Sequence, residues 1–293
     1  MEGTHEALKE HLGLSLSTSV INKITQQIGS EARKFNSEIE APEKGVPLLV
    51  VEIDGSMVPI VEYNEASEKQ KKLGLKRDRN CFWKEFRLCT VSIPKEARTT
   101  YGITTGTPFE AGCMMSETCR TRGMDESTHI HGVGDGAPWI ADQYEVQFGA
   151  NHSFLIDFFH ASEYLSDASK IVGTESEGKE WYKLQREKLR TNKEIEVVKI
   201  LEELHKENPE SEAIEKCHRY LANRVEYLNY ASALAEDLPI GSGEVESGHR
   251  SVLQKRLKKP GAWWIMANAE TMAHLKTLQA NCLWSNFWEK IAA

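Results

Sequence analysis

The order of the apolar segments constrains the fold of this chain more than any other feature. Five segments between residues 47 and 160 have the apolar or alternating pattern of β-strands. They are PLLVVEID (47–54), EFRLCTVSI (85–93), PFEAGCMMS (108–116), HIHGVGDGAPWI (129–140) and HSFLIDFFH (152–160). A helix is expected from about residue 116 to residue 123 or beyond. Three strands, a crossover and two further strands predict an α/β domain with a mixed five-stranded sheet flanked by helices.

Residues 161–238 have a different pattern, because three segments show helical periodicity with no strand signal between them. They are ASEYLSDASKIVG (161–173), WYKLQREKLRTNKEIEVVKILEELHKE (181–207) and ESEAIEKCHRYLANRVEYLNYASALAED (210–237). This block has 17 acidic residues against 12 Lys and Arg, in a chain of net charge −8. After the breaker LPIGSG, a helix is predicted over residues 244–259, ended by Pro260-Gly261, and one aromatic-rich helix over residues 262–291.

The first 45 residues predict two short amphipathic helices separated by LGLSLSTS, where Ser17 or Ser19 caps the second. This pair is either a remnant of a DNA-binding helix-turn-helix or plain packing. APEKGVP (41–47) is a turn-rich linker. The predicted organisation is therefore a helical N-terminal segment (1–45), the first part of an α/β domain (46–160), a helical insertion (161–238) and C-terminal helices of the α/β domain (239–293).

Composition limits the compartment and the partners. No apolar run approaches the roughly 18 residues of a membrane span, and the first residues lack the apolar core of a secretory signal. The six cysteines form no CxxC pair, which favours a reducing compartment and small core residues over a zinc site. We therefore expect a cytoplasmic protein without a membrane partner. The negative net charge requires any nucleic-acid surface to be local.

Two aspartates, each followed by glycine, stand at the ends of predicted strands. Asp54 closes VEIDG, and Asp135 closes HGVGDG. Asp-Gly is a common turn dipeptide, but GAPWI after Asp135 resembles the start of a helix, with Pro138 in its first turn. A carboxylate at the rim of a sheet can hold a metal ion, and the glycine allows close approach of a ligand. PIGSGEVESGHR supplies a third acid, either Glu244 or Glu246. These two residues are about 200° apart on a helix, so they cannot both face one site. The pattern alone leaves that choice open.

Taken together, these segments resemble a known family. VEIDG, WKEFR (83–87), HGVGDGAPWI, DFFHASEYL (157–165), PIGSGEVESGHRSVLQKRLKKPGAWW (239–264) and SNFWEKI (285–291) are similar, in this order, to DDE-type transposases of bacterial insertion sequences. The group is the one related to Mutator-like elements, and the resemblance implies an RNase H-like catalytic domain with an all-helical insertion before the catalytic glutamate helix. Family members usually carry a longer N-terminal portion for binding the element's ends.

The resemblance also implies roles for individual residues. Asp54 and Asp135 match the two catalytic aspartates, and the Gly-Ser-Gly-x-x-Glu element selects Glu246 over Glu244, which it leaves exposed. Asp157 and His160 match an Asp-x-x-His element whose histidine lies near the active site. His160 then contacts the scissile phosphate or orients a ligand; the other interpretation is a buried histidine bonded to a backbone carbonyl.

The implied reaction is Mg²⁺-dependent DNA cleavage and strand transfer. Three carboxylates can hold two Mg²⁺ or Mn²⁺ ions that activate a nucleophile and stabilise the leaving oxygen, and oxygen ligands suit magnesium. The partners would be double-stranded DNA, as transposon ends and target, in a homodimer or higher oligomer associated with the nucleoid. Two alternatives are a related RNase H-like nuclease that cuts without strand transfer, and a catalytically silent DNA-binding or regulatory protein derived from a transposase.

Two basic clusters are candidates for contacting DNA phosphates. One follows the first strand, and the second, which is better placed, lies on and after the glutamate helix; either cluster could instead be an ordinary solvated surface. The first comprises Lys69, Lys71, Lys72, Lys76, Arg77 and Arg79, and the second Arg250, Lys255, Arg256, Lys258 and Lys259. Four tryptophans could stack on bases, although their helical spacing favours core positions. They are Trp263, Trp264, Trp284 and Trp288.

Overall fold

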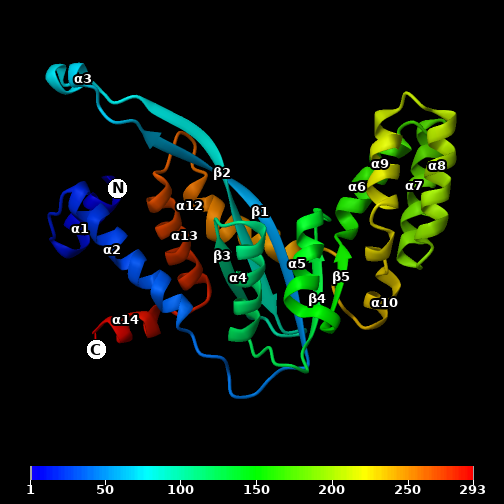
Figure 1. Ribbon diagram of the computed structural model, residues 1–293, viewed down its shortest axis with the longest axis horizontal. Coiled ribbons are helices and arrows are strands. Elements are labelled where there is room, and N and C mark those ends of the chain that lie inside the picture. The colour runs from blue at the N-terminus through cyan, green and yellow to red at the C-terminus, as the bar shows by residue number, and fades with distance from the viewer. Residues whose placement is uncertain (1, 293) are drawn as a thin grey trace.

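The computed structural model of the chain describes residues 2–292, and its centre is a five-stranded sheet in the order β3-β2-β1-β4-β5. The strands are β1 (Leu48–Tyr63), β2 (Arg79–Ser92), β3 (Thr99–Thr104), β4 (His129–Gly134) and β5 (His152–Ile156). β1, β4 and β5 are parallel, whereas β2 is antiparallel to both β1 and β3. This mixed sheet, flanked by helices, is consistent with an RNase H-like arrangement and confirms the predicted fold class (Figure 1).

The two faces of β1 enter two different hydrophobic clusters. Leu49, Val51 and Ile53 pack with the helices α4 (Pro108–Thr121) and α5 (Pro138–Phe148). Val58 and Ile60 pack instead with residues of α13 (Met266–Ala280) and of a helix made of α11 (Gly243–Gly248), η3 (His249–Gln254) and α12 (Lys255–Leu257). Alternation along the strand then puts Glu52 and Asp54 on the face covered by the second set of helices.

The segment 108–116, predicted as a strand, is a helix. Thr107 caps α4 through a reciprocal capping box with Glu110, and Pro108 occupies the first turn, so the local chain has a complete helix-start signal. The third strand is instead the short β3, TTYGIT, which the sequence prediction missed. Pro138 begins α5 as predicted.

β1 does not end at Asp54, as predicted, but continues for nine residues to Tyr63. The residues after Gly55 keep a strand pattern and pair with an equally long β2, from Ser56 opposite Phe86 to Tyr63 opposite Arg79. The predicted strand 85–93 accordingly begins earlier, at Arg79. This hairpin projects from the sheet and carries α3 (Glu68–Leu73) at its tip (Figure 1).

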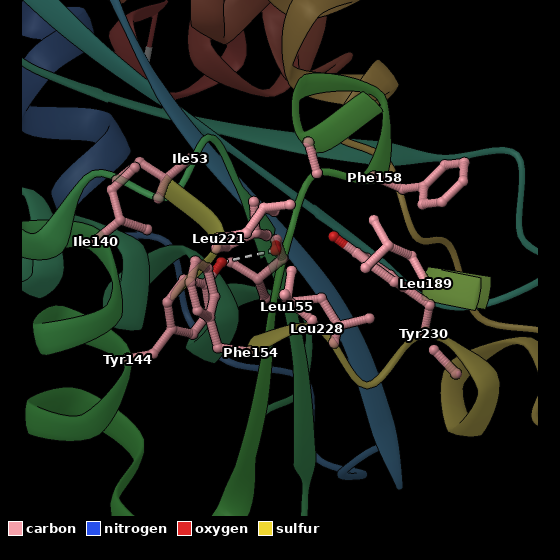
Figure 2. Packing of buried hydrophobic residues seen from close by; sticks show 14 of the residues in the cluster. Ile53, Ile140, Tyr144, Phe154, Leu155, Phe158, Leu189, Leu221, Leu228 and Tyr230 are labelled. Carbon is pink, nitrogen blue, oxygen red and sulfur yellow. Dashed lines mark hydrogen bonds between the residues drawn. The ribbon is translucent and has the colours of Figure 1, made fainter. Parts of the chain in front are cut away.

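Between β5 and α11 the described chain contains only helical elements, gathered at the opposite end of the molecule from α3 (Figure 1). They are α6 (Phe158–Ser169), α7 (Glu175–Arg190), α8 (Glu194–Glu207), α9 (Glu212–Ala222), η2 (Val225–Tyr227) and α10 (Tyr230–Ala235). Figure 2 shows Leu189, Leu221 and Tyr230 of this region beside Leu155 and Phe158. The helices and the sheet therefore share one hydrophobic core. Packing is also close between β4 and α5, because a Cβ atom at Gly132 would collide with the ring of Tyr144.

The N-terminal helices α1 (Glu2–Leu12) and α2 (Thr18–Ser37) form the predicted pair, and Ser17 caps α2. α2 lies along α13, where a Cβ at Gly29 would meet Thr271. The helix predicted over residues 262–291 is two helices, α13 and α14 (Trp284–Ala292), because Cys282 adopts a positive φ of 59°. No helix within residues 2–292 is long and apolar enough to cross a membrane.

Some residues expected in the core are exposed. Trp263, Trp284 and Trp288 are about 40% exposed, and none of them belongs to a hydrophobic cluster, whereas Trp264 packs against the cluster of Val58 and Ile60. Among the cysteines, Cys89, Cys119 and Cys217 are buried, whereas Cys81, Cys113 and Cys282 are exposed.

Candidate functional site

Asp54 and Glu246 line the same cleft. Its volume is about 490 Å³, and its walls come from β1 and from the helix that begins at α11. The lining residues are Asp54, Gly55, Ser56, Met57, Glu246, His249, Arg250, Gln254 and Lys258. Two carboxylates, an imidazole and two cationic side chains thus share one open depression. Such a set can bind a cation beside a phosphate group.

Asp135 is the first residue after the neighbouring strand β4. β1 and β4 pair in parallel from Leu48 opposite His129 to Glu52 opposite Val133. Asp54 and Asp135 each lie two residues beyond the last pair of this register. The Asp135 carboxylate accepts a hydrogen bond from the Ala137 N–H at 2.9 Å, and it is not among the residues that line the cleft.

The helical region 158–235 fixes the turn that carries Asp135. The Tyr220 hydroxyl donates to the Asp135 carbonyl at 2.6 Å, and Arg224 Nε donates to the Gly136 carbonyl at 2.7 Å. Gly136 has a φ of +82°, which is favourable only for glycine. The Asp-Gly pair is therefore held by α9 and the residues that follow it.

Two buried carboxyl groups anchor the start of the glutamate helix. Asp157 Oδ2 accepts hydrogen bonds from the backbone N–H and the hydroxyl of Ser242, at 2.6 and 2.5 Å. Glu52 accepts from the Val245 N–H at 2.8 Å. Since Ser242 makes no capping bond to its own helix, Glu52 satisfies an N–H group that the N-terminus leaves free. The first turn, and hence Glu246, is tied to β1 and to the end of β5.

Glu52 is 1% exposed, and burial raises the pKa of its carboxyl group to about 8, although the Val245 N–H acts in the opposite direction. The group is therefore mainly protonated at neutral pH. It accepts a backbone hydrogen bond without placing a full negative charge beneath the helix. The sequence analysis missed this residue, but an acidic side chain inside the apolar run LLVVEI was the signal for it.

His249 is a second residue that the sequence analysis missed. It is 3% exposed, its Nε2 atom lies 3.4 Å from Asp54 Oδ2, and neither ring nitrogen has a hydrogen-bond partner among residues 2–292. It begins the π-helical turn η3, a local distortion found frequently at functional sites. Glu246 and His249 are three residues apart, so they share one helix face, and this spacing was visible in the sequence.

Glu244 and Glu246 point to different surroundings, as their spacing requires. Thr99 donates a hydrogen bond to Glu244 at 3.1 Å, outside the cleft. Glu246 is about half exposed and lies 3.4 Å from Arg250 Nη2. This arginine therefore neutralises a cleft carboxylate in the structure.

The donor set fits a hard divalent cation, although the ligands are not already gathered around one point. Asp54, Ser56 and Glu246 supply oxygen atoms to the cleft, and Asp135, which follows β4, does not line it. Within the described part of the chain, no three Asp, Glu, His or Cys side chains are close enough to hold one metal ion. Convergence on one ion therefore requires these residues to rearrange.

The predicted basic residues have different surroundings. Arg250 and Lys258 line the cleft, Arg256 packs over the ring of Trp264, and Lys255 and Lys259 are exposed outside it. The first cluster lies on α3 and the adjoining end of the hairpin, away from the cleft. There Lys71 pairs with Glu68, Arg77 lies over Tyr63, and Lys72 and Lys76 are exposed.

His160 lies apart from the cleft. Its side chain is 39% exposed, with Nδ1 3.7 Å from Asp157 Oδ2, so it is not the buried histidine of the second interpretation. Its own N–H donates to Asp157, which caps α6. The Asp157 side chain of this pair is thus used in two local anchors.

A sequence profile of an uncharacterised protein family, UPF0236, matches residues 117–286, more than half of the chain. The chain belongs to the UPF0236 family. The part that matches UPF0236 contains Asp135, Asp157, Glu246 and His249, and it begins after Asp54. A comparison with curated proteins gave no match.

Proposed function

We propose that this UPF0236 protein is a DDE-type transposase related to Mutator-like elements, which cleaves DNA and transfers the cut strand. The observation that supports this proposal is the cleft that Asp54 and Glu246 both line, with Asp135 directly after β4, the strand parallel to β1. These acids come from distant parts of the chain. The substrates are the element's ends and target DNA, bound by a homodimer or a higher oligomer at the nucleoid.

The carboxylates of Asp54, Asp135 and Glu246 would hold Mg²⁺ or Mn²⁺. When bound, such ions activate the attacking oxygen and stabilise the leaving oxygen in a displacement at phosphorus. Their ligand preference agrees with the carboxylate oxygens present and requires no thiol.

The remaining residues of the cleft position these acids and attract the substrate. His249 lies beside Asp54, with Nε2 3.4 Å from Oδ2, and would orient that carboxylate by donating a hydrogen bond to it. Glu52 and Asp157 hold the helix that presents Glu246. Arg250 and Lys258 place positive charge where a DNA phosphate must approach, which lowers the repulsion between the phosphate and the carboxylates.

A cleavage assay with labelled element ends and target DNA tests the proposal. Single alanine substitutions of Asp54, Asp135 or Glu246 should abolish Mg²⁺-dependent cleavage, whereas Glu244→Ala should leave it nearly unchanged, because Glu244 faces Thr99. An active Glu246→Ala variant beside an inactive Glu244→Ala variant would reverse the assignment.

The products of the same assay separate strand transfer from simple hydrolysis. Joined end–target molecules support transposase activity. Cut ends without joined molecules identify a nuclease on the same site. A wild-type protein that binds DNA but never cuts it would identify a silent, transposase-derived regulator.

A further inference from the structure

The β1–β2 hairpin extends far beyond the rest of the sheet. From the Ser56–Phe86 pair to the Tyr63–Arg79 pair, these strands form a two-stranded arm with α3 at its tip (Figure 1). Along the arm, the described chain adds one short backbone contact, in which Trp264 donates to the Pro59 carbonyl and accepts from the Val61 N–H. One face of the arm is buried by Val58, Ile60 and Phe86 against the α13 side.

The opposite face of the arm carries exposed aromatic side chains. Trp83 is 54% exposed and Trp263 is 40% exposed, with their rings 6.1 Å apart at an angle of 58°. Trp83 pairs across the hairpin with Pro59, so alternation puts both on the same face as Met57. We call this the tryptophan surface: Met57, Trp83 and Trp263. Exposed aromatic pairs cost solvation free energy, so a surface of this kind indicates a binding partner.

The tryptophan surface is continuous with the cleft. Met57 is 44% exposed and lines the cleft together with Asp54 and Glu246. Pro59, opposite Trp83, is two residues further along β1, a distance of about 7 Å in an extended strand. A polymer that leaves the cleft along β1 therefore reaches Trp83 within about one or two nucleotides.

The charge of the arm identifies the partner as an anion. Residues 56–86, which form the arm and its tip, contain seven Lys and Arg against five acidic residues, in a chain whose net charge is −8. The helical block 161–238 contains the excess acid, at the other end of the molecule (Figure 1). Most of these basic residues lie on α3 and at the end of the hairpin that adjoins it, while Lys84 directly follows Trp83 on β2. Aromatic side chains together with positive charge are the combination that binds unpaired nucleic-acid strands.

We propose that the tryptophan surface binds an unpaired DNA strand next to the cleft, by stacking bases on Trp83 and Trp263. Bases in a duplex stack on one another, so only an unpaired or unwound strand can use these rings. The lysines and arginines of the arm attract phosphates of either form. This inference rests on the proposed function, since it assigns to the same enzyme a strand-binding surface beside its cutting site.

The test is fluorescence anisotropy of the full chain with a labelled single-stranded oligonucleotide and with the corresponding duplex, in EDTA. Trp83→Ala and Trp263→Ala should each weaken single-strand binding about tenfold and duplex binding by less than about twofold. Trp83→Phe retains a ring and should bind the single strand almost as the wild type does. Trp284→Ala, which removes a tryptophan of 42% exposure from α14, is the matched control.

Equal losses for single strand and duplex, or an equal loss in Trp284→Ala, would overturn the inference. A change of oligomeric state in Trp83→Ala, measured by light scattering and without a selective loss of strand binding, would show that the surface pairs two copies of the chain instead. Because EDTA removes divalent ions, the binding result does not depend on catalysis. Selective strand binding without any cleavage would support the tryptophan surface as a strand-binding site and reject the transposase proposal. Cleavage without selective strand binding would support the transposase proposal and reject the strand-binding role of this surface.

Discussion

At the scale of single residues, the candidate site depends on buried groups that do not line the cleft. Glu52 lies beneath the first turn of α11 and accepts the Val245 N–H, while Asp157 binds Ser242 from the end of β5. A helix N-terminus has backbone N–H groups without partners, and burial makes an unsatisfied one costly. The position of Glu246 is thus determined by acids that are themselves buried.

Two substitutions of Glu52 test how much its hydrogen bond to the Val245 N–H contributes to stability. Glu52→Leu leaves the buried Val245 N–H without an acceptor and should lower the free energy of unfolding by about 1–3 kcal/mol. Glu52→Gln keeps a neutral acceptor of nearly the same shape and should cost less than half as much. Urea unfolding at neutral pH measures both variants. Equal destabilisation of the two would show that the hydrogen bond to α11 is not what Glu52 contributes.

At the scale of elements, the interface between α2 and α13 contains a titratable group. His274 on α13 has a pKa lowered to about 4, by burial first and by Arg33 of α2 second, while Glu270 acts in the opposite direction. The folded state therefore resists protonation that an unfolded histidine, with a pKa near 6.5, accepts. The contribution of His274 to the free energy of unfolding is fully present above pH 6.5 and is lost as the pH falls toward 4.

This linkage predicts that the stability of the wild type and that of His274→Gln depend differently on pH. Between pH 6.5 and 4, His274 should contribute a loss of about 1.4 kcal/mol in unfolding free energy per pH unit. Urea unfolding at several pH values measures it as the difference between the two proteins, since other groups titrate in both. Parallel stability curves for the wild type and the variant would contradict a neutral His274 in the folded state.

The observed strands and helices show which sequence signals were sufficient to predict secondary structure. Five strands were predicted, and four lie near their predicted positions, because apolar runs such as LLVVEI indicate buried strands directly. PFEAGCMMS was assigned to a strand because its apolar content was weighed above Thr107, Pro108 and Glu110, which form a helix start. The length of β1 depends on its pairing with β2, a long-range contact that a single run does not encode.

The candidate site shows the same limit, because contacts between distant segments cannot be predicted from one segment alone. Asp-Gly pairs and the Gly-Ser-Gly-x-x-Glu element led to Asp54, Asp135 and Glu246, and the structure brings Asp54 and Glu246 into one cleft. His249 was missed because its contact with Asp54 joins residues on different elements. The acid inside LLVVEI marks Glu52 as unusual, but its partner is a backbone N–H of a distant helix, so the sequence does not indicate what Glu52 binds.

At the scale of the whole molecule, three regions of the chain carry the proposed acids. β1 carries Asp54, the turn after β4 carries Asp135 and is held by Tyr220, and the chain that returns after the helices 158–235 carries Glu246. The positively charged arm and the acidic helical block lie at opposite ends (Figure 1). DNA would therefore approach from the side of the arm, where the repulsion is weakest.

The convergence of these regions on a divalent ion is the central claim, and Mn²⁺ binding to the full chain, followed by electron paramagnetic resonance, tests it most directly. Asp54→Asn and Glu246→Gln should weaken Mn²⁺ binding by more than the roughly 10- to 100-fold that follows loss of a supporting group. Glu244→Gln should bind Mn²⁺ as the wild type does, because its side chain faces Thr99. Wild-type affinity in both Asp54→Asn and Glu246→Gln would contradict the account.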